Sequence, residues 1–397
     1  MEEWQRGWRT VLGSGLAAGT GVSLLYFVFS MFIPQLQKET GWTLGQFSQL
    51  QALVGVGSLA APLVGWAMDR YGFRKVWAIG MAAVAGLYIM IGLAPMIPAL
   101  FGVTIFITGL IGVSTTSISY TRAVNGWFSR HRGMALAVAA TGLSLAAVIV
   151  PPLLQPLIEV HGWRAGYFAL AAAALLIGLP AIMFLVGDGV GAAKAEAQPH
   201  QSYFDDSFYR TGAFWLLCIG YVGLNMPTSG MLSQMVPMLL EEGLTPAKAA
   251  LGISAYAGGQ FVGRLACGWL LDRTHPQRVA FFFTLVPAIG AALLWQTQGH
   301  YAAAMIAVAA IGIQQGAEVD LLAYFVARRF GLDRYGSIYG WVQVAGWIGT
   351  LCGILLFGKV HDWTGSYALF QGAAVFSFIF AAVAFLCIRL PAQRVFT

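Results

Sequence analysis

Long apolar runs alternate with short polar clusters along the whole chain. Each run holds about 20 residues or more, the length that an α-helix needs to cross a lipid bilayer. The pattern predicts an all-α membrane protein whose twelve transmembrane helices lie at approximately 12–34, 46–67, 76–96, 99–122, 133–156, 165–187, 212–237, 248–270, 279–297, 301–326, 337–358 and 367–388.

Composition supports this class and excludes others. The chain of 397 residues is 58% hydrophobic and only 10% charged, whereas about 25% of the residues in an average soluble domain are charged. The net charge of +6 comes from short clusters between apolar runs, so no nucleic-acid partner is expected. The four cysteines lie inside apolar runs without metal-ligand spacing, and neither a metal nor another cofactor is expected.

Lys and Arg residues are distributed unevenly between alternate loops. One set of loops, together with both termini, carries most of them, and the other set carries only Lys38, Arg164, Lys248 and Lys359. Cytoplasmic loops of membrane proteins carry an excess of Lys and Arg. The pattern therefore predicts an integral protein of the cell (inner) membrane with both termini in the cytoplasm.

The sequence repeats itself once. The longest polar stretch, 188–211, divides the spans six and six, and GWAMDR at 65–70 returns as GWLLDR at 268–273. In the same way HGWRAGYFAL at 161–170 returns as HDWTGSYALF at 361–370. We therefore expect two pseudo-symmetric six-helix bundles, 1–187 and 212–397, joined by a cytoplasmic linker.

The loop after the second span, GWAMDRYGFRK at 65–75, resembles the corresponding loop of the major facilitator superfamily. The resemblance implies a carrier whose two halves rock around a site at the middle of the membrane. Asp69 with Arg70, and their copies Asp272 with Arg273, would then form gate latches. The alternative is that these residues only anchor the loops in the cytoplasm.

A second motif is more specific. WFSRHRGMALAVAATG at 127–142 resembles the segment that joins the fourth and fifth helices of monocarboxylate and oxalate/formate-type transporters. In those carriers an Arg that follows a Gly in the eighth helix contacts the substrate carboxylate. Gly263 and Arg264 occupy that setting here, so the resemblance implies that Arg264 binds the substrate.

The position of Arg264 supports this role physically. It lies eight residues before Asp272, which places it roughly 12 Å deep in a hydrocarbon core about 30 Å thick. A guanidinium at that depth needs a wet cavity or a partner. It either holds a substrate carboxylate as a planar fork or forms a structural ion pair between helices.

Proton coupling is predicted to involve the tenth span. The resembling carriers have an Asp one turn before the Arg, where this chain has Gln260. Glu318 and Asp320 lie at about the same depth as Arg264 and point to nearly opposite sides of their helix. Asp320 is the first choice as proton carrier because Tyr324 follows one turn later, and Glu318 is the second. The alternative is a static pair between Arg264 and one of the two carboxylates.

Other polar and aromatic residues inside the spans are candidates to line the substrate path. The set comprises Tyr26, Tyr120, Asn225, Gln260 and Tyr324, of which the resembling carriers use polar residues on the helices of Tyr120, Asn225 and Tyr324. Each of them, taken singly, is also ordinary helix-packing material.

Together these features predict a secondary transporter of small organic anions, most specifically a proton-coupled monocarboxylate symporter that works by alternating access. Its expected partners are a small carboxylate, protons and the lipid bilayer, and it is expected to function as a monomer. The alternatives are an organic-anion exchanger, an efflux antiporter or a non-transporting membrane sensor. No enzymatic activity is expected, because the sequence carries no nucleotide loop, metal cluster or nucleophile–base motif.

Overall fold

The computed structural model describes residues 2–57, 60–93, 97–128, 132–187, 208–271, 273–297, 299–330 and 335–388. The chain divides into two compact units, Met1–Gln201 (unit 1) and Ser202–Thr397 (unit 2). Most of the predicted linker, 188–211, and Asp272 lie outside the described residues, as do the side chains of Asp69 and Asp320.

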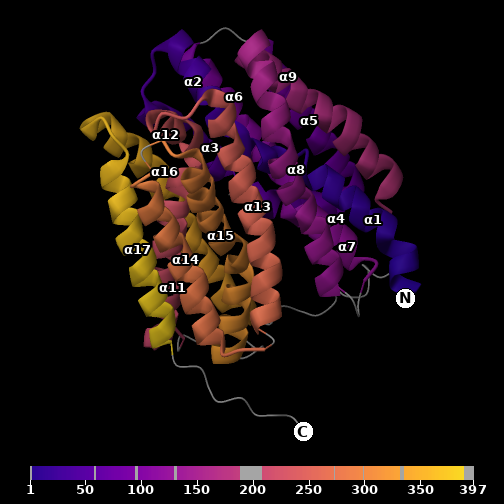
Figure 1. Cartoon of the computed structure of the whole chain (residues 1–397). Helices are drawn as coiled ribbons and strands as arrows, with labels where there is room; N and C mark the ends of the chain where they lie inside the picture. Colours follow the sequence, from indigo (N-terminus) through magenta and orange to yellow (C-terminus); the bar gives the residue numbers. More distant parts are fainter. Residues whose placement is uncertain are drawn as a thin grey trace. The chain divides into compact units, whose positions relative to one another are not determined.

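Unit 1 is built from helices in its described part (Figure 1). They are α1 (Glu2–Ala18), α2 (Val22–Thr40), α3 (Leu44–Gly57), α4 (Ala61–Tyr71), α5 (Phe73–Leu93), α6 (Pro98–Gly112), α7 (Ser117–Asn125), α8 (Arg132–His161) and α9 (Trp163–Ala173). A short 3₁₀ turn, η2 (Val113–Thr115), joins α6 to α7, and two π-helical turns, η3 (Ala174–Gly178) and η4 (Ala181–Leu185), continue α9.

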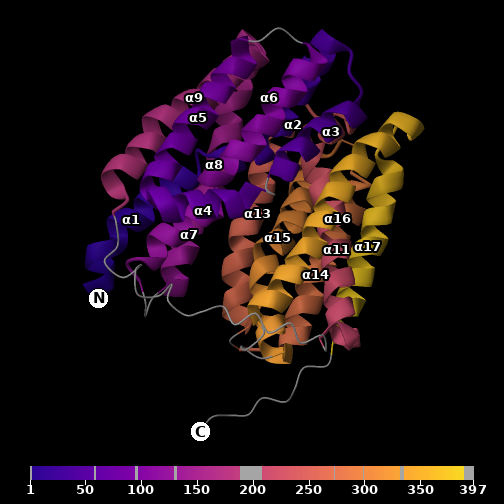
Figure 2. The same ribbon diagram turned by 180° about the vertical axis from the view of Figure 1, so that it is seen from behind.

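Unit 2 is likewise helical where it is described (Figure 2). After a 3₁₀ turn, η5 (Phe208–Arg210), its helices are α11 (Gly212–Ser233), α12 (Met235–Glu241), α13 (Pro246–Leu271), α14 (Pro276–Leu294), α15 (Tyr301–Phe330), α16 (Tyr335–Thr364) and α17 (Ala368–Cys387). The all-α fold predicted from the apolar runs is confirmed, with helix in the described part of every predicted span.

Some predicted spans consist of two helices rather than one, and local chemistry explains the breaks. Between α1 and α2 the chain bends at Gly21, where a Cβ would lie 2.7 Å from the Thr115 hydroxyl oxygen. That hydroxyl accepts the N–H of Val22 at 3.0 Å and so satisfies the first turn of α2. Between α11 and α12, Pro237 has no N–H with which to bond the carbonyl of Ser233, where α11 ends.

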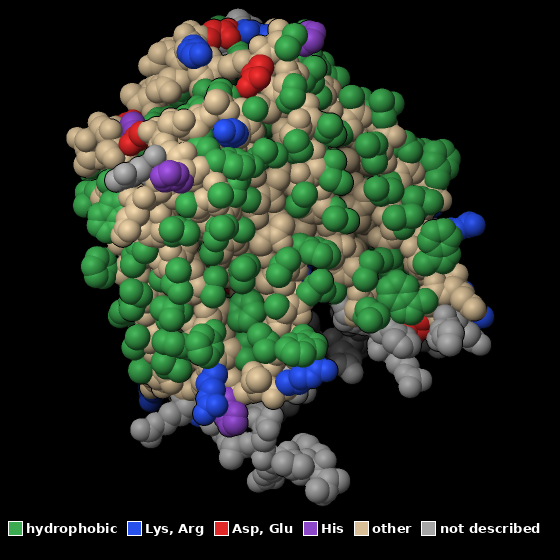
Figure 3. All heavy atoms as spheres, in the orientation of Figure 1, with side chains coloured by type: hydrophobic (Ala, Val, Ile, Leu, Met, Phe, Trp, Pro, Cys, Tyr) green, Lys and Arg blue, Asp and Glu red, His purple; other side chains and the backbone are tan. Residues whose placement is uncertain are grey.

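Eight helical segments of the described chain are long and apolar enough to cross a membrane. Figure 3 shows hydrophobic side chains over the flanks of the helices and most charged side chains near helix ends. In unit 2, α11, α13 and α15 are absent from the eight. These three helices carry Asn225, Arg264 and Glu318.

The two units use the same helix pairs. In unit 1, α1 packs on α8, α3 on α6 and α5 on α9, and in unit 2 α11 packs on α16, α13 on α15 and α14 on α17. In each list these are the first and fifth, second and fourth, and third and sixth spans of a half. The duplication read from the loop motifs therefore extends to the packing.

The α13–α15 pair determines where the candidate residues lie. A Cβ on Gly263 would lie 2.0 Å from the carbonyl oxygen of Ile313, and one on Gly316 would lie 2.0 Å from that of Gln260. Glycine at such positions lets the two backbones touch. The thiol of Cys267 reaches the carbonyl of Ala317 at 3.9 Å, so the helices run parallel in a fixed register. The register places Arg264 at the level of Gly316 and the residues that follow it.

Candidate functional site

A buried carboxylate lies at the centre of the polar residues of unit 2. Glu318 on α15 is 5% exposed. Its Oε1 accepts the Nδ2–H of Asn225 on α11 at 2.7 Å, and its Oε2 accepts the amide of Gln315. The hydroxyl of Tyr221 also hydrogen-bonds to Glu318. A buried carboxylate needs such partners, and all three of these are uncharged.

Both amides are oriented by further hydrogen bonds. The Tyr256 hydroxyl of α13 donates to Oε1 of Gln315 at 3.3 Å, and the Thr350 hydroxyl of α16 donates to Oδ1 of Asn225 at 3.4 Å. Because each amide oxygen already accepts a hydroxyl, each NH₂ group is directed at Glu318. The network thus joins α11, α13, α15 and α16 around one carboxyl group.

Arg264 lies on α13, on the stripe that also carries Gln260 and Tyr256 (the Arg264 flank), and Tyr256 connects this stripe to the Glu318 network. Its side chain is half-buried on α13. Within the described part of the chain, its guanidinium has neither a hydrogen-bond nor an ion-pair partner. One turn earlier on the same stripe, Oε1 of Gln260 is buried and accepts no hydrogen bond from any described group. This flank therefore places the N–H donors of the Arg264 guanidinium near an acceptor, Oε1 of Gln260, that no described group uses.

The helical register separates the two candidate proton carriers. Asp320 lies one turn beyond Gly316, whose Cα faces the carbonyl of Gln260 and the backbone nitrogen of Arg264. The backbone of Asp320 is therefore on the α13-facing side of α15, whereas Glu318 bonds across to α11. The alternative of a static pair between Arg264 and Glu318 does not match the described contacts, because uncharged side chains hold Glu318.

The other predicted residues of unit 2 fall into two groups. Asn225, 7% exposed, belongs to the Glu318 network, while Tyr324 is half-buried one turn beyond Asp320. The sequence reading missed Tyr221, Gln315 and Thr350. Tyr221 lies one turn before Asn225, and Gln315 lies three residues before Glu318, so helical spacing from predicted residues contained the signal.

In unit 1 the predicted lining residues lie on different helices. Tyr120 on α7 packs against a cluster of buried residues that includes Val11, Val124 and Phe128. Tyr26 on α2 receives the side-chain amide of Gln51 on its carbonyl at 3.3 Å. Neither contact assigns a ligand to these tyrosines, so their role in lining the path stays a prediction.

The two loop motifs share one feature in the structure. The Arg70 guanidinium lies 5.6 Å from the ring centre of Trp66, and that of Arg273 lies 4.2 Å from the ring centre of Trp269. In unit 1, Arg74 of the same motif donates to the carbonyls of Ile182 and Met183 in the π-helical turn η4. Because Asp69 and Asp272 are not described, the latch itself stays a prediction.

Comparisons with known proteins agree with the geometry. A sequence model of the Major Facilitator Superfamily matches residues 15–242 and 217–395. The chain is 25% identical over 393 residues to human "Monocarboxylate transporter 11", covering 94% of this chain and 81% of that protein. It is 27% identical over 302 residues to "Monocarboxylate transporter 13" of Rattus norvegicus, covering 72% and 69% of the two chains.

Solved structures match the fold. The nucleoside transporter NupG superposes with a TM-score of 0.76 at 14% sequence identity, covering 96% of this chain and 99% of the other. A bacterial homologue of the human lysosomal transporter Spinster gives 0.70 at 14% identity, covering 96% and 95%. At this identity the likeness concerns architecture alone.

Proposed function

Since the chain belongs to the Major Facilitator Superfamily, a family of membrane transporters rather than enzymes, we propose that it carries small monocarboxylates across the membrane together with protons. The single observation that carries the substrate class is Arg264. It presents an unpaired guanidinium, among the described residues, on α13, which is predicted to cross the membrane, and such a group favours an anionic partner.

A carboxylate is the anion that suits this flank. A guanidinium binds a carboxylate through two parallel N–H···O bonds, and its planar fork cannot lose its proton. The free Oε1 of Gln260 one turn away adds an acceptor for a hydroxyl or N–H group on the substrate. The names of two relatives, monocarboxylate transporters 11 and 13, support the same class.

The register of α15 supports a proton-coupling role for Asp320. Protonation of Asp320 would free Arg264 for the substrate anion, and departure of the anion would return Arg264 to the ionised Asp320. One proton would accompany one monovalent anion, which makes transport electroneutral. Glu318 is the second candidate. Its oxygens are already hydrogen-bonded to Asn225, Gln315 and Tyr221, so Arg264 would have to displace these partners to pair with it.

Location and oligomeric state complete the proposed function. The protein would lie in the cell (inner) membrane with both termini in the cytoplasm and would function as a monomer. A second function, exchange of one organic anion for another, uses the same Arg264 and differs only in lacking the proton step. Drug-type efflux is a poorer fit because it gives a buried guanidinium no anion to bind.

The direct test exchanges Arg264 for lysine. Arg264→Lys keeps the charge and loses the fork, so binding of short-chain monocarboxylates to purified protein should weaken at least tenfold. Binding is measured by the rise in melting temperature with ligand concentration, and uptake by proteoliposomes. Arg329→Lys, an exposed arginine near the end of α15, is the matched control and should bind as the wild type does. Unchanged affinity in Arg264→Lys would refute the carboxylate fork.

A further inference from the structure

A second ionisable cluster lies at one end of unit 2, away from the Arg264 flank. Oε2 of Glu241, the last residue of α12, is 2.9 Å from Nε2 of His361 on α16. Its Oε1 accepts the backbone N–H of Tyr367, just before α17, at 3.4 Å. One carboxylate thus joins three helix ends. The His361 and Tyr367 rings lie 4.4 Å apart, and Tyr367 in turn stacks on Phe357.

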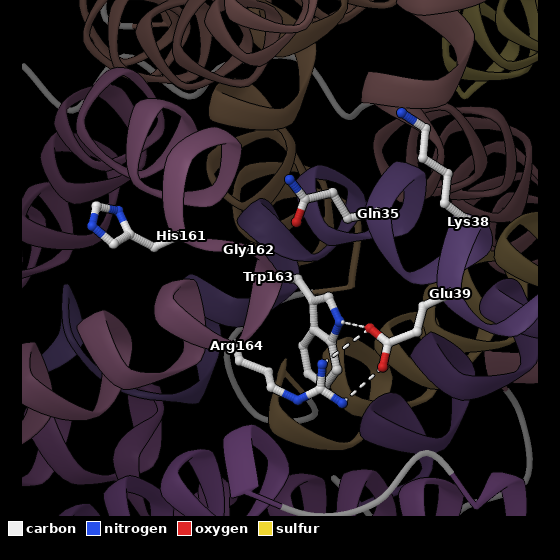
Figure 4. Close-up of a pocket in the computed structure, with 7 residues that line it drawn as sticks. All are labelled: Gln35, Lys38, Glu39, His161, Gly162, Trp163 and Arg164. Carbon is white, nitrogen blue, oxygen red and sulfur yellow. Dashed lines mark hydrogen bonds and ion pairs between the residues drawn. The ribbon is translucent and has the colours of Figure 1, made fainter.

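In unit 1 the equivalent carboxylate binds a different cation. Glu39 occupies the position of Glu241 in the repeat and binds Arg164 through two hydrogen bonds of 2.8 and 3.1 Å. The indole N–H of Trp163 donates to it at 2.6 Å. In Figure 4, His161, the counterpart of His361, points away from Glu39. An arginine keeps its charge at every physiological pH, whereas a histidine does not.

A shift in helix length explains the exchange of cations. In unit 1, α8 ends at His161 because Gly162 follows with φ +84°. In unit 2, α16 continues to Thr364 and ends before Gly365, whose φ is +70°. The extra helical residues keep His361 on the face toward Glu241 and turn Trp363 outward, 78% exposed, whereas Trp163 is 3% exposed. Thr364 stands where unit 1 has Arg164.

Among the described residues, the charged and titratable groups near the pair lie on several elements. Asp362 and Lys359 lie on α16 beside His361, and Glu242 accepts the Thr297 hydroxyl at 3.1 Å. His300 follows Gly299, where a Cβ would lie 3.0 Å from the Glu242 carbonyl oxygen. Lys248 on α13 lies over the ring of Tyr301. Histidine is the side-chain type whose charge changes between pH 5 and 8, and His361 is the histidine in contact with Glu241 among the described residues.

We propose that the Glu241–His361 pair is a proton-binding site separate from the transport site, at which pH controls how firmly the ends of α12, α16 and α17 are joined. When His361 is protonated, an ionised hydrogen bond closes the junction. As pH rises and the imidazole loses its proton, the ion pair is lost and a weaker hydrogen bond from the neutral imidazole to the carboxylate is left. Acidification therefore tightens this end of unit 2, while the Arg164–Glu39 junction of unit 1 stays closed. The inference needs neither the carboxylate fork nor Asp320.

Hydrogen–deuterium exchange on the purified full-length protein tests the inference. After correction for the intrinsic pH dependence of exchange, peptides covering 234–245 and 361–368 should exchange about two- to fivefold more slowly at pH 5.5 than at pH 8, the effect expected of a partly exposed ion pair. His361→Arg should be protected at both pH values, and His361→Gln at neither. His161→Gln, the matched control, should behave as the wild type. The same pH effect in wild type and His361→Gln would overturn the proposal.

A second measurement covers the case in which a His361 variant does not fold. Glu241→Gln removes the carboxylate and leaves His361 in place, and its exchange is measured at the same two pH values. The pH effect on the peptides covering 234–245 and 361–368 should be lost, whereas His161→Gln should keep it. An unchanged pH effect in Glu241→Gln contradicts the proposal. Failure of Arg264→Lys to lose substrate binding would affect the proposed transport site and leave this result intact.

Discussion

The α3–α6 pair of unit 1 and the α13–α15 pair of unit 2 occupy equivalent positions in the repeat but carry different kinds of side chain. Both pack with their backbones in contact: a Cβ on Gly57 would lie 2.3 Å from the carbonyl carbon of Gly109, much as one on Gly316 would lie 2.0 Å from an oxygen of α13. In unit 1 the buried polar residues of α6 bond within their own helix, as Thr108 does to the Thr104 carbonyl at 2.7 Å. In unit 2 the equivalent helices carry Arg264, Glu318 and Asp320.

The difference indicates a division of work between the two units of the duplicated fold. Glycine contacts fix the spacing of both pairs, so they are a requirement of the fold. Charged residues occur in only one of the pairs, where they cost solvation free energy and need a reason to be kept. Under the proposed function, substrate and proton chemistry belong to α13 and α15, and we expect changes there to alter transport while matched changes in unit 1 alter mainly stability.

The largest effect is expected at Asp320. Asp320→Asn should abolish accumulation driven by a pH gradient yet preserve counterflow between two substrate-loaded sides, since exchange needs no return of the empty carrier. Proteoliposomes loaded with a labelled short-chain monocarboxylate allow both assays on one preparation. Glu318→Gln should retain accumulation and lose stability, because two or more hydrogen bonds of its network are disturbed.

The pair of variants separates the two carboxylates. If Glu318→Gln alone loses pH-driven accumulation, the proton carrier is Glu318 and the register argument for Asp320 is wrong. If both variants accumulate substrate against its gradient as the wild type does, neither carboxylate couples transport to protons. Exchange of organic anions would then be the better description of the function.

A smaller effect is expected from the glycine contacts. Gly316→Ala places a methyl group against the Gln260 carbonyl and 2.7 Å from the backbone nitrogen of Arg264. It should destabilise the protein by about 1–3 kcal/mol and weaken substrate binding by displacing Arg264. Gly109→Ala should cost similar stability without changing affinity. Gly258→Ala, where a Cβ meets nothing within 4 Å, is the control, and melting temperatures with and without substrate give both quantities. Equal loss of affinity in Gly109→Ala would contradict the division of work between the units.

The sequence was sufficient for the fold because hydrophobic length and loop repeats are properties of contiguous residues. It did not show the interruptions inside the spans, because these depend on contacts between distant residues, such as the Thr115 hydroxyl with Val22 N–H, 93 positions apart. Nor did it show that Gly162 and Gly365 end equivalent helices at different positions, which moves His361 into contact with Glu241.

The candidate site was predictable in its residues and less so in its connections. Depth along a helix supported Arg264 and Glu318 as candidates, because rise per residue is constant, and Asn225 was a candidate because the resembling carriers use polar residues on its helix. The hydrogen-bond partners of each residue depend on the rotation and register of the packed helices. In the α13–α15 pair, glycine contacts set both the rotation and the register. Asn225 was therefore predicted as lining, whereas the structure makes it a hydrogen-bond donor to Glu318.

The smallest effect is expected at the repeated loop motif, where both units have the same Arg–Trp contact and differ only in its distance. Arg273 stacks on Trp269 at 4.2 Å and Arg70 on Trp66 at 5.6 Å, contacts worth about 0.5–1 kcal/mol at exposed sites. If the loops act as latches through charge, Arg70→Gln and Arg273→Gln should each slow transport about two- to fivefold with unchanged substrate affinity, and the lysine variants should restore the rate. If the stacking itself is required, lysine should fail to restore it, and more so at Arg273 because its stack is closer. Initial rates and affinities in proteoliposomes measure the difference. Wild-type rates in both glutamine variants would leave the arginines as anchors of the cytoplasmic loops.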